Sequence, residues 1–304
     1  MWHQSFSEFF DACVGKGGSL SILSLDLFVA ALRLATPIAL VALGETFSER
    51  SGVINVGVEG TALAGALICA VVSYFSGSPL AASLAAIAVG AFLGLIHSLW
   101  AVYLRADHVV SGVAINLLVS GAALFSTRII WGWRGTSPSA PTLNPWLFVA
   151  LGVVLVILGQ IYIFHTPWGL RLRVVGEHPQ AADTAGINVN RTRLVYTVVN
   201  GALCGLAGAF LFNNLGRFTE GMVGGRGFIG IAAMVVGNYR PLPALAAAYF
   251  FGLVDALQMR LQAYIPSQFS IILPYLLTVV VLAGFLGRAH VPKALGKPYI
   301  KESR

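Results

Sequence analysis

The sequence predicts an all-α fold: a polytopic transmembrane helical bundle with about nine membrane segments, some of them broken or re-entrant. The first observation is composition, because only 10% of the 304 residues are charged and 57% are hydrophobic. A soluble domain carries roughly 25% charged residues, so an ordinary soluble enzyme is excluded. The second observation is the length of the apolar runs. No residue between Glu59 and Arg105 is charged, which leaves room for two helices of about 20 residues each.

The apolar runs divide the chain into nine predicted segments, whose ends are approximate. Eight of them are long enough to cross a bilayer. Segment 228–238 is too short to cross alone, so it either re-enters or uses the glycine-rich residues before it. The nine segments are 27–46, 53–75, 79–104, 109–129, 146–164, 194–214, 228–238, 242–261 and 269–286.

The distribution of positive charge predicts the orientation in the membrane. The net charge of +7 does not indicate nucleic-acid binding, because dense basic runs with interleaved aromatic residues are absent from the sequence. With nine crossings, most Lys and Arg fall on the cytoplasmic side, as the positive-inside rule requires. We therefore expect a periplasmic tail at 1–26, a transmembrane domain at 27–287 with a cytoplasmic loop at 166–193, and a basic cytoplasmic tail at 288–304.

The sequence contains no motif for catalysis or for a cofactor. The three cysteines, Cys13, Cys69 and Cys204, are scattered and form no C-x-x-C pair, so neither a metal site nor a disulfide framework is indicated. No nucleophile elbow occurs, and the sequence has no G-x-x-x-x-G-K-[ST] motif. We therefore expect a protein that is not an enzyme, and any ATP-driven work must come from a partner.

A polar interruption at 44–60 lies between two apolar segments. Its glycines disfavour one continuous helix. Backbone that is broken at membrane depth must be buried in protein or face a water-filled cavity, and transporters commonly build binding sites from such helices. We expect Glu49 and Arg50 at the inner surface, and Asn55 and Glu59 deeper, facing a pathway. The alternative is a simple cytoplasmic hairpin.

A second glycine-rich interruption lies at 221–230. One interruption in each half of the chain indicates a weak two-half repeat, with a site at the interface between the repeats. Asn116 and Asn200 are polar residues within predicted spans. Each either forms an interhelical hydrogen bond or faces the pathway.

The hydrophilic loop 166–193 contains a predicted short helix. Pro179 suits the first position of a helix, and Gly186 is a typical stop signal. About two turns are too short to be stable alone in water, so this helix needs a surface to lie against. It is either a plain connecting helix or a docking element for a cytoplasmic partner.

Three segments resemble motifs of one transporter family. They contain Glu45, Ser48-Glu49-Arg50, Gly52, Asn55, Gly57 and Glu59-Gly60; then Pro179, Ala181-Ala182 and Gly186-Ile187; then 225–233 and Gly237-Asn238-Tyr239-Arg240-Pro241. Together they resemble the inner-membrane permeases of bacterial ABC importers, in the branched-chain amino acid and simple-sugar permease superfamily. The first segment is similar to the nucleoside-type branch, which works with a binding lipoprotein of the basic-membrane-protein type.

The resemblance implies a multi-pass permease subunit in the bacterial inner membrane that moves a small polar solute, with nucleosides as the first expectation. Simple sugars and branched-chain amino acids are the alternatives, and an ion-coupled secondary transporter is a weaker one. The implied partners are a second permease subunit in a heterodimer, two ATPase subunits or a tandem ATPase, and a periplasmic or lipoprotein substrate-binding protein. The resemblance also implies that the complex is surrounded by membrane lipid and binds no nucleic acid.

The resemblance also implies two groups of site residues, and no catalytic residue, cofactor or metal. The expected substrate pathway consists of Glu45, Asn55, Glu59, Asn116 and Asn200. The expected ATPase-coupling loop consists of Gly176, Glu177, Pro179, Ala181, Ala182, Asp183, Gly186 and Ile187.

Overall fold

The computed structural model describes residues 25–132, 135–262, 272, 276–280, 283–284 and 290–300. Most of the predicted tail 1–26, most of segment 269–286 and the ends of the tail 288–304 lie outside these residues. The described elements are α2 (Leu25–Ser51), α3 (Val58–Ser76), α4 (Pro79–Ser98), the π-helical turn η1 (Leu99–Tyr103), α5 (His108–Trp131), α6 (Pro145–His165), α7 (Pro167–Glu177), α8 (Pro179–Thr184), α9 (Val189–Leu215), α10 (Arg226–Val236) and α11 (Pro241–Leu261).

The predicted fold class is confirmed, whereas the count of nine segments is not. Seven helices in the described part of the chain are long and apolar enough to cross a membrane: α2, α3, α4 with η1, α5, α6, α9 and α11. They correspond to seven of the nine predicted segments. The predicted segment 228–238 is the 11-residue helix α10, and the predicted segment 269–286 lies mostly outside the described residues.

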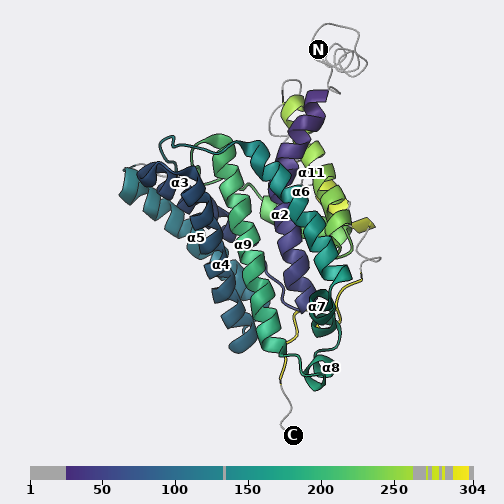
Figure 1. The fold of residues 1–304 in the computed structure, drawn as a ribbon. Coiled ribbons are helices and arrows are strands. Elements are labelled where there is room, and N and C mark those ends of the chain that lie inside the picture. Colours follow the sequence, from purple (N-terminus) through teal and green to yellow (C-terminus); the bar gives the residue numbers. More distant parts are fainter. Residues whose placement is uncertain are drawn as a thin grey trace.

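Helix α9 lies in the middle of the bundle (Figure 1). It packs against α3 and α4 on one side and against α2 on the other, and α2 in turn packs against α10 and α11. Glycines allow the closest of these approaches. A Cβ atom added at Gly94 would lie 2.6 Å from the carbonyl oxygen of Thr197, and one added at Gly65 would lie 2.6 Å from that of Gly205. Small residues therefore set the helix spacing, as is typical of membrane bundles.

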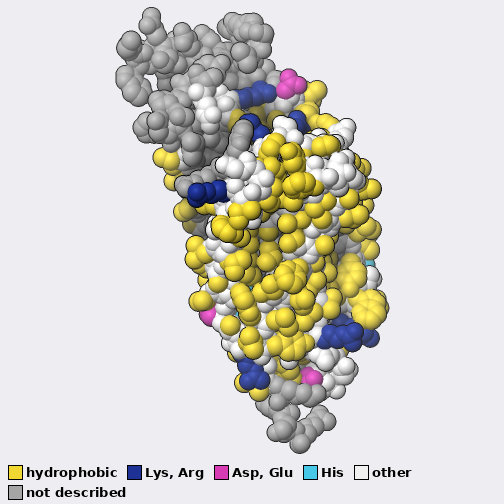
Figure 2. Space-filling model, turned by 90° about the vertical axis from the view of Figure 1, so that its left-hand side faces the viewer, with side chains coloured by type: hydrophobic (Ala, Val, Ile, Leu, Met, Phe, Trp, Pro, Cys, Tyr) yellow, Lys and Arg dark blue, Asp and Glu magenta, His cyan; other side chains and the backbone are white. Residues whose placement is uncertain are grey.

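The outer faces of the bundle are apolar. On α5, Leu117 is 70% exposed and Phe125 is 67% exposed. Figure 2 shows hydrophobic side chains over most of the face formed by α3 to α5, with Lys and Arg near its two ends. An apolar surface of this extent needs lipid or another subunit to cover it, so the chain is a multi-pass membrane protein.

Helices α7 and α8 lie at the end of the bundle where α2 ends (Figure 1). The segment 290–300 packs there as well. The Ala294 amide donates to the Gly176 carbonyl at 2.9 Å, and the Gly296 amide donates to the Gly52 carbonyl at 3.0 Å. This carboxyl-terminal segment therefore connects α7 to the break that follows α2.

Candidate substrate pathway and coupling site

The predicted break in the first polar interruption is present between α2 and α3, at residues 52–57. Gly52 has a φ of +101°, in a region that residues with a side chain rarely adopt. The Ser48 hydroxyl donates to the Val53 carbonyl at 2.9 Å, and the Val53 amide donates to the Ser48 carbonyl at 3.1 Å. The chain therefore turns sharply as α2 ends.

Three basic side chains satisfy the backbone groups around the break. Arg193, which is 1% exposed, donates to the Ser51 carbonyl at 3.2 Å. His97 Nε2 lies 2.9 Å from the Ile54 carbonyl oxygen, and the Ile54 amide donates to His108 Nδ1 at 3.2 Å. Irregular backbone inside a membrane protein needs such partners, so the break is an ordered structure rather than a loose hairpin.

Two of the predicted pathway residues, Glu45 and Asn200, form a buried pair between α2 and α9. The Asn200 Nδ2 donates to Glu45 Oε1 at 2.6 Å, and both residues are 0% exposed. The Cys204 thiol also contacts the pair, at 3.2 Å from Asn200 Oδ1. The pair therefore lies in the sealed core between these two helices.

Two other predicted pathway residues, Asn55 and Asn116, hold the start of α3. The Gly57 amide donates to Asn55 Oδ1 at 3.0 Å. Asn116, from α5, accepts a hydrogen bond from the Gly60 amide at 2.7 Å and donates one to the Val56 carbonyl at 2.9 Å. Both side chains therefore stabilise backbone that would otherwise lack partners.

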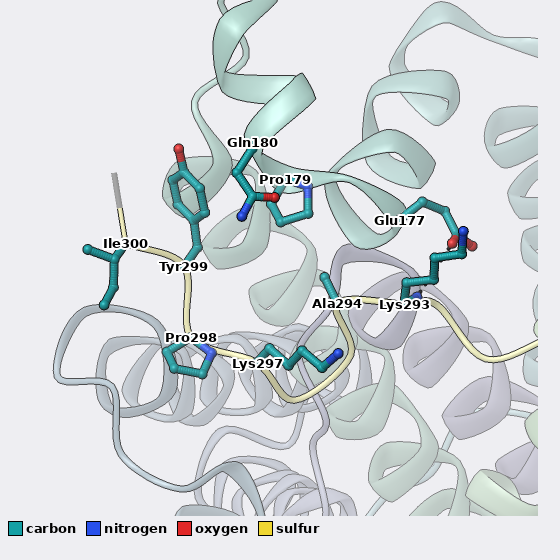
Figure 3. A pocket seen from close by; sticks show the side chains of 9 residues that line it. All are labelled: Glu177, Pro179, Gln180, Lys293, Ala294, Lys297, Pro298, Tyr299 and Ile300. Atoms are coloured by element: carbon teal, nitrogen blue, oxygen red, sulfur yellow. Dashed lines mark hydrogen bonds between the residues drawn. The ribbon is translucent and has the colours of Figure 1, made fainter. Parts of the chain in front are cut away.

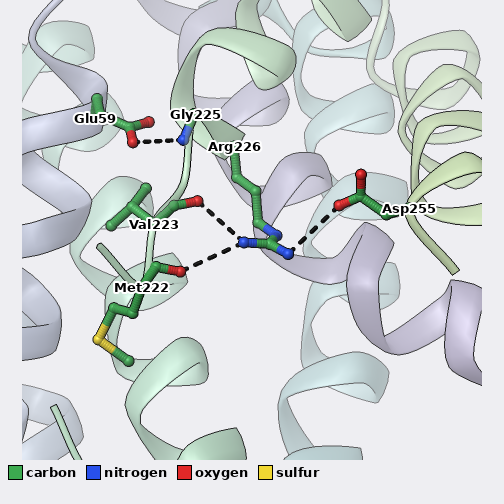
Figure 4. A network of polar contacts seen from close by, with 6 residues as sticks. All are labelled: Glu59, Met222, Val223, Gly225, Arg226 and Asp255. Carbon is green, nitrogen blue, oxygen red and sulfur yellow. Dashed lines mark hydrogen bonds and ion pairs between the residues drawn. The ribbon is translucent and has the colours of Figure 1, made fainter. Parts of the chain in front are cut away.

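The fifth residue, Glu59, joins the two glycine-rich interruptions (Figure 4). Its carboxylate accepts hydrogen bonds from the amides of Gly225 and Gly227, each at 2.8 Å. These amides are at the beginning of α10, where the helix dipole favours a negative charge. The next side chain, Arg226, forms an ion pair with Asp255 of α11 at 3.4 Å. The two interruptions, far apart in the sequence, therefore meet at one place.

Glu49, which we expected at the inner surface beside Arg50, is only 4% exposed, so its side chain is packed inside the protein, and its depth in the membrane stays a prediction. It is buried beside the hydroxyl of Tyr239, in the turn between α10 and α11, which donates a hydrogen bond to it. Burial and the adjacent Glu49 charge raise the pKa of Tyr239, so the hydroxyl keeps its proton. Arg50 donates to the Tyr239 carbonyl at 2.5 Å, and these contacts attach the end of α2 to the end of α10.

A cavity of about 210 Å³, lined by both polar and apolar groups, lies beside the start of α3. Two of the five predicted pathway residues, Glu59 and Asn116, line it, whereas the other three do not. Sequence reasoning did not select Ser120 or Glu220, which also line it. In the described part of the chain, no group of three or more His, Cys, Asp or Glu side chains is placed to hold a metal ion. The lining residues are Glu59, Gly60, Leu63, Asn116, Ser120, Glu220, Gly221, Val223 and Gly224.

The short helix predicted in the hydrophilic loop is present as α8. Pro179 occupies its first turn. Gly186, with a φ of +81°, ends it, and the Ile187 amide donates to the Ala182 carbonyl at 2.9 Å. Sequence reasoning missed the helix before it, α7, although Thr166 caps that helix and Pro167 begins it.

Helix α8 has an anchored face and an exposed face. Ala182 is 0% exposed and packs with Val175, Val189 and Tyr299. Ala181 and Ala185, in contrast, are exposed. A cavity of about 520 Å³ lies between α8 and the carboxyl-terminal segment, and Gln180 and Lys297 are among its lining residues (Figure 3).

The eight predicted coupling residues also divide by position. Gly176 is buried against the Arg50 carbonyl at the end of α2, and Ala182 is buried as described. Ala181 and Gly186 are exposed, whereas Glu177, Pro179, Asp183 and Ile187 are partly buried. The loop therefore contacts α2 on one side and presents a short helix on the other.

Comparison with known proteins places the chain in a family. The model of the family described as the permease component of the branched-chain amino acid transport system matches residues 27–282. The chain is 40% identical to the guanosine ABC transporter permease protein NupQ of Bacillus subtilis, with 94% of this chain and 99% of that protein covered. It is 35% identical to the nucleoside ABC transporter permease protein NupC of Lactococcus lactis, with 91% and 98% covered.

A solved structure supports the fold alone. It is an ABC transporter assigned to the metal-chelate type, in an inward-facing conformation, with a TM-score of 0.50 and 17% sequence identity over 85% of each chain. Because a match to the family model extends over most of the transmembrane region and includes both interruptions, the chain belongs to the family of branched-chain amino acid transport system permease components.

Proposed function

We propose that this chain is the transmembrane permease subunit of a bacterial ABC importer that carries nucleosides across the inner membrane. The observation that carries the proposal is the cavity with polar lining residues where the two interruptions meet, in a chain 40% identical to a guanosine permease. A nucleoside is neutral and polar, so its path needs hydrogen-bonding groups rather than one strong charge. Asn116, Ser120 and the acids Glu59 and Glu220 supply such groups around the cavity.

The size of the cavity supports a second permease subunit. Ligand pockets usually measure about 300–1,000 Å³, and this cavity measures about 210 Å³. We propose that it is one wall of a larger site, which a second subunit completes in a heterodimer. The exposed apolar face of α5, which contributes Asn116 and Ser120, is available to pack against that subunit or against lipid.

We assign the energy source to cytoplasmic ATPase subunits that dock on α8. The gathering of basic residues at this end, Arg50, Arg173, Arg193 and Lys297 among them, favours a cytoplasmic location. Because Ala182 packs against Val175 of α7, a movement of α8 would be transmitted to α7. The buried Gly176 of α7 in turn contacts the end of α2. A substrate-binding protein delivers the solute at the opposite face, and the chain itself hydrolyses nothing.

Transport by the reconstituted complex tests the proposed function. The chain is co-purified with the ATPase, second permease and binding protein encoded beside it, and is placed in liposomes with internal ATP. We expect uptake of labelled guanosine that requires ATP and is not competed by excess glucose or leucine. ATP-dependent uptake of a sugar or of leucine instead would assign another solute. Uptake driven by an ion gradient through this chain alone would overturn the ABC mechanism.

Paired substitutions test the docking role of α8. Ala181→Arg places a charge on the exposed face of the helix and should reduce ATP-driven uptake by about tenfold or more, because a buried unpaired charge weakens an interface. Ala106→Arg, the same change in another exposed loop, is the matched control and should keep normal uptake. Co-purification of the ATPase is measured for both variants. Normal coupling in Ala181→Arg would remove this helix from the docking site.

A further inference from the structure

Three arginines from three separate elements surround one aromatic ring. The guanidinium carbons of Arg50, Arg173 and Arg240 lie 5.0, 5.2 and 5.7 Å from the centre of the Phe164 ring. Arg50 is at the end of α2, Arg173 is on α7, and Arg240 directly precedes α11. Like charges held this close repel one another, so the arrangement favours a negative partner.

The described residues do not supply enough negative charge to balance this arginine cluster. No ion pair to Arg50, Arg173 or Arg240 is present within the described ranges of the chain. Glu177 lines the same cavity as the arginines, and its carboxylate also accepts a hydrogen bond from the Lys293 amide at 3.4 Å. The Nε atom of Arg173 is buried and has no hydrogen-bond partner among the described residues. A donor left in this state indicates a missing acceptor.

The arginine cluster borders a cavity of about 320 Å³, large enough for a small polar group. It is lined by Arg50, Phe164, Arg173, Glu177, Asn238, Arg240 and His290. The His290 amide donates to Asn238 Oδ1 at 2.6 Å, and the three guanidinium groups carry the positive charge at this cavity. A planar guanidinium group can form two parallel hydrogen bonds to two oxygens of one phosphate, whereas a lysine ammonium cannot.

A separate apolar groove lies along the seam between α6 and α11. The groove measures about 350 Å³ and also touches α2. Leu242, which lines it, follows Arg240 by two residues, and Leu245 and Tyr249 continue the same face of α11. On α6, Gly152 and Val153 line the groove, while Phe164 lines the cavity at the end of the same helix. A charged cavity and an apolar groove therefore lie along the same two helices.

We propose that the cavity and the groove together bind one anionic phospholipid, with its phosphate among Arg50, Arg173 and Arg240 and an acyl chain along α6 and α11. Basic pockets between membrane helices on the cytoplasmic side typically bind acidic lipid headgroups. A free phosphate ion would use the cavity but has no group for the groove. The lipid would hold together α2, α7 and α11, the elements that carry the arginine cluster.

Native mass spectrometry of the delipidated full-length chain tests the headgroup half of the site. Phosphatidylglycerol and phosphatidylcholine with identical acyl chains are titrated separately. We expect phosphatidylglycerol to bind about tenfold more tightly, and the preference to disappear in Arg173→Gln/Arg240→Gln, because charge-assisted hydrogen bonds to phosphate are lost. Arg171→Gln is the matched control, since Arg171 is on the same helix but stacks on Trp168, 4.6 Å from its centre. It should bind as the unchanged chain does.

A second pair of variants tests the groove. Ala246→Trp fills the groove, because Ala246 is exposed and lines it, and should weaken phosphatidylglycerol binding by about tenfold through lost apolar contact. Phe250→Trp, on the same helix but outside the groove, should not. Folding of each variant is checked by thermal melting. If the double arginine variant fails to fold, Arg240→Gln alone repeats the test at an exposed residue.

Several results would overturn the proposal. One is equal binding of the two lipids by the unchanged chain. Another is displacement of phosphatidylglycerol by millimolar inorganic phosphate, which would indicate a free-anion site. A third is a double arginine variant that keeps normal lipid binding but no longer co-purifies with the ATPase subunits, which would make the arginine cluster a protein contact.

Discussion

The two polar clusters formed by the predicted pathway residues differ in what surrounds them. Glu45 and Asn200 are paired in the sealed core between α2 and α9, with 0% exposure for both. Both carboxylate oxygens of Glu59 accept hydrogen bonds and Asn116 forms two, whereas Glu45 Oε2 has no hydrogen-bond partner among the described residues; yet Glu59 and Asn116 border a cavity. A hydrogen-bonded polar side chain in a membrane helix is therefore compatible with either role. If the cavity belongs to the proposed pathway, empty space beside the group, rather than its polarity, separates a pathway residue from a structural one.

The largest effect is expected at the cavity. Glu59→Ala removes a carboxylate that accepts two backbone hydrogen bonds, each with a contribution of about 1.5–3 kcal/mol for a charged acceptor. Guanosine uptake by the reconstituted complex should fall about 10- to 100-fold, because the start of α10 and the wall of the cavity both lose their anchor.

Glu59→Gln sharpens this prediction. Its amide oxygen can accept one of the two hydrogen bonds, so uptake should lie between those of the unchanged chain and Glu59→Ala. Unchanged uptake in Glu59→Ala, with normal assembly, would remove Glu59 from the pathway and break the distinction between the two clusters.

A smaller effect, on stability rather than on transport, is expected in the sealed core. Glu45→Ala and Asn200→Ala each remove one partner of the 2.6 Å hydrogen bond, and interhelical hydrogen bonds of this kind contribute about 0.6–2 kcal/mol. A double-mutant cycle on the free energy of unfolding should give a coupling of similar size. Uptake per folded complex should stay within about twofold. A large loss of uptake without a loss of stability would instead assign this pair to the pathway.

The smallest effect is expected at Ser120, which lines the cavity and is partly buried. Ser120→Ala removes one hydroxyl, and a neutral hydrogen bond to a solute is worth about 0.5–1.5 kcal/mol. The KM for guanosine should rise about two- to tenfold with no change in thermal stability. Ser111→Ala is a useful contrast, because Ser111 on the same helix contacts His97 rather than the cavity. It should change stability and leave the KM unaltered.

The sequence predicted the membrane helices well, because each depends on a continuous apolar run that a single chain displays. The break after α2 was predictable from its glycines, and α8 from the local signals of Pro179 and Gly186. Helix α7 was missed, although Thr166 and Pro167 are ordinary start signals, because its two arginines lay in a segment interpreted as a loop.

The division of the polar residues could not be predicted, because it depends on contacts between distant segments. Glu59 meets Gly225 across 166 positions, and no local pattern specifies that pairing. Arg193 was counted as a cytoplasmic charge, yet it is buried at the break. The sequence around a single Arg at the start of an apolar run does not indicate which distant carbonyl group its side chain will bind. The inward orientation of Ala182 on α8 likewise depends on Val175 and Val189 from neighbouring elements.

Helix α10 is fastened at both of its ends. Glu59 holds the first turn through two amides, while Glu49 and Arg50 hold Tyr239 just beyond the last turn. A helix of 11 residues is about 16 Å long and is stiff over that distance. A rigid connection of this kind would transmit a displacement at the end of α2 to the first turn of α10, where Glu59 borders the proposed pathway.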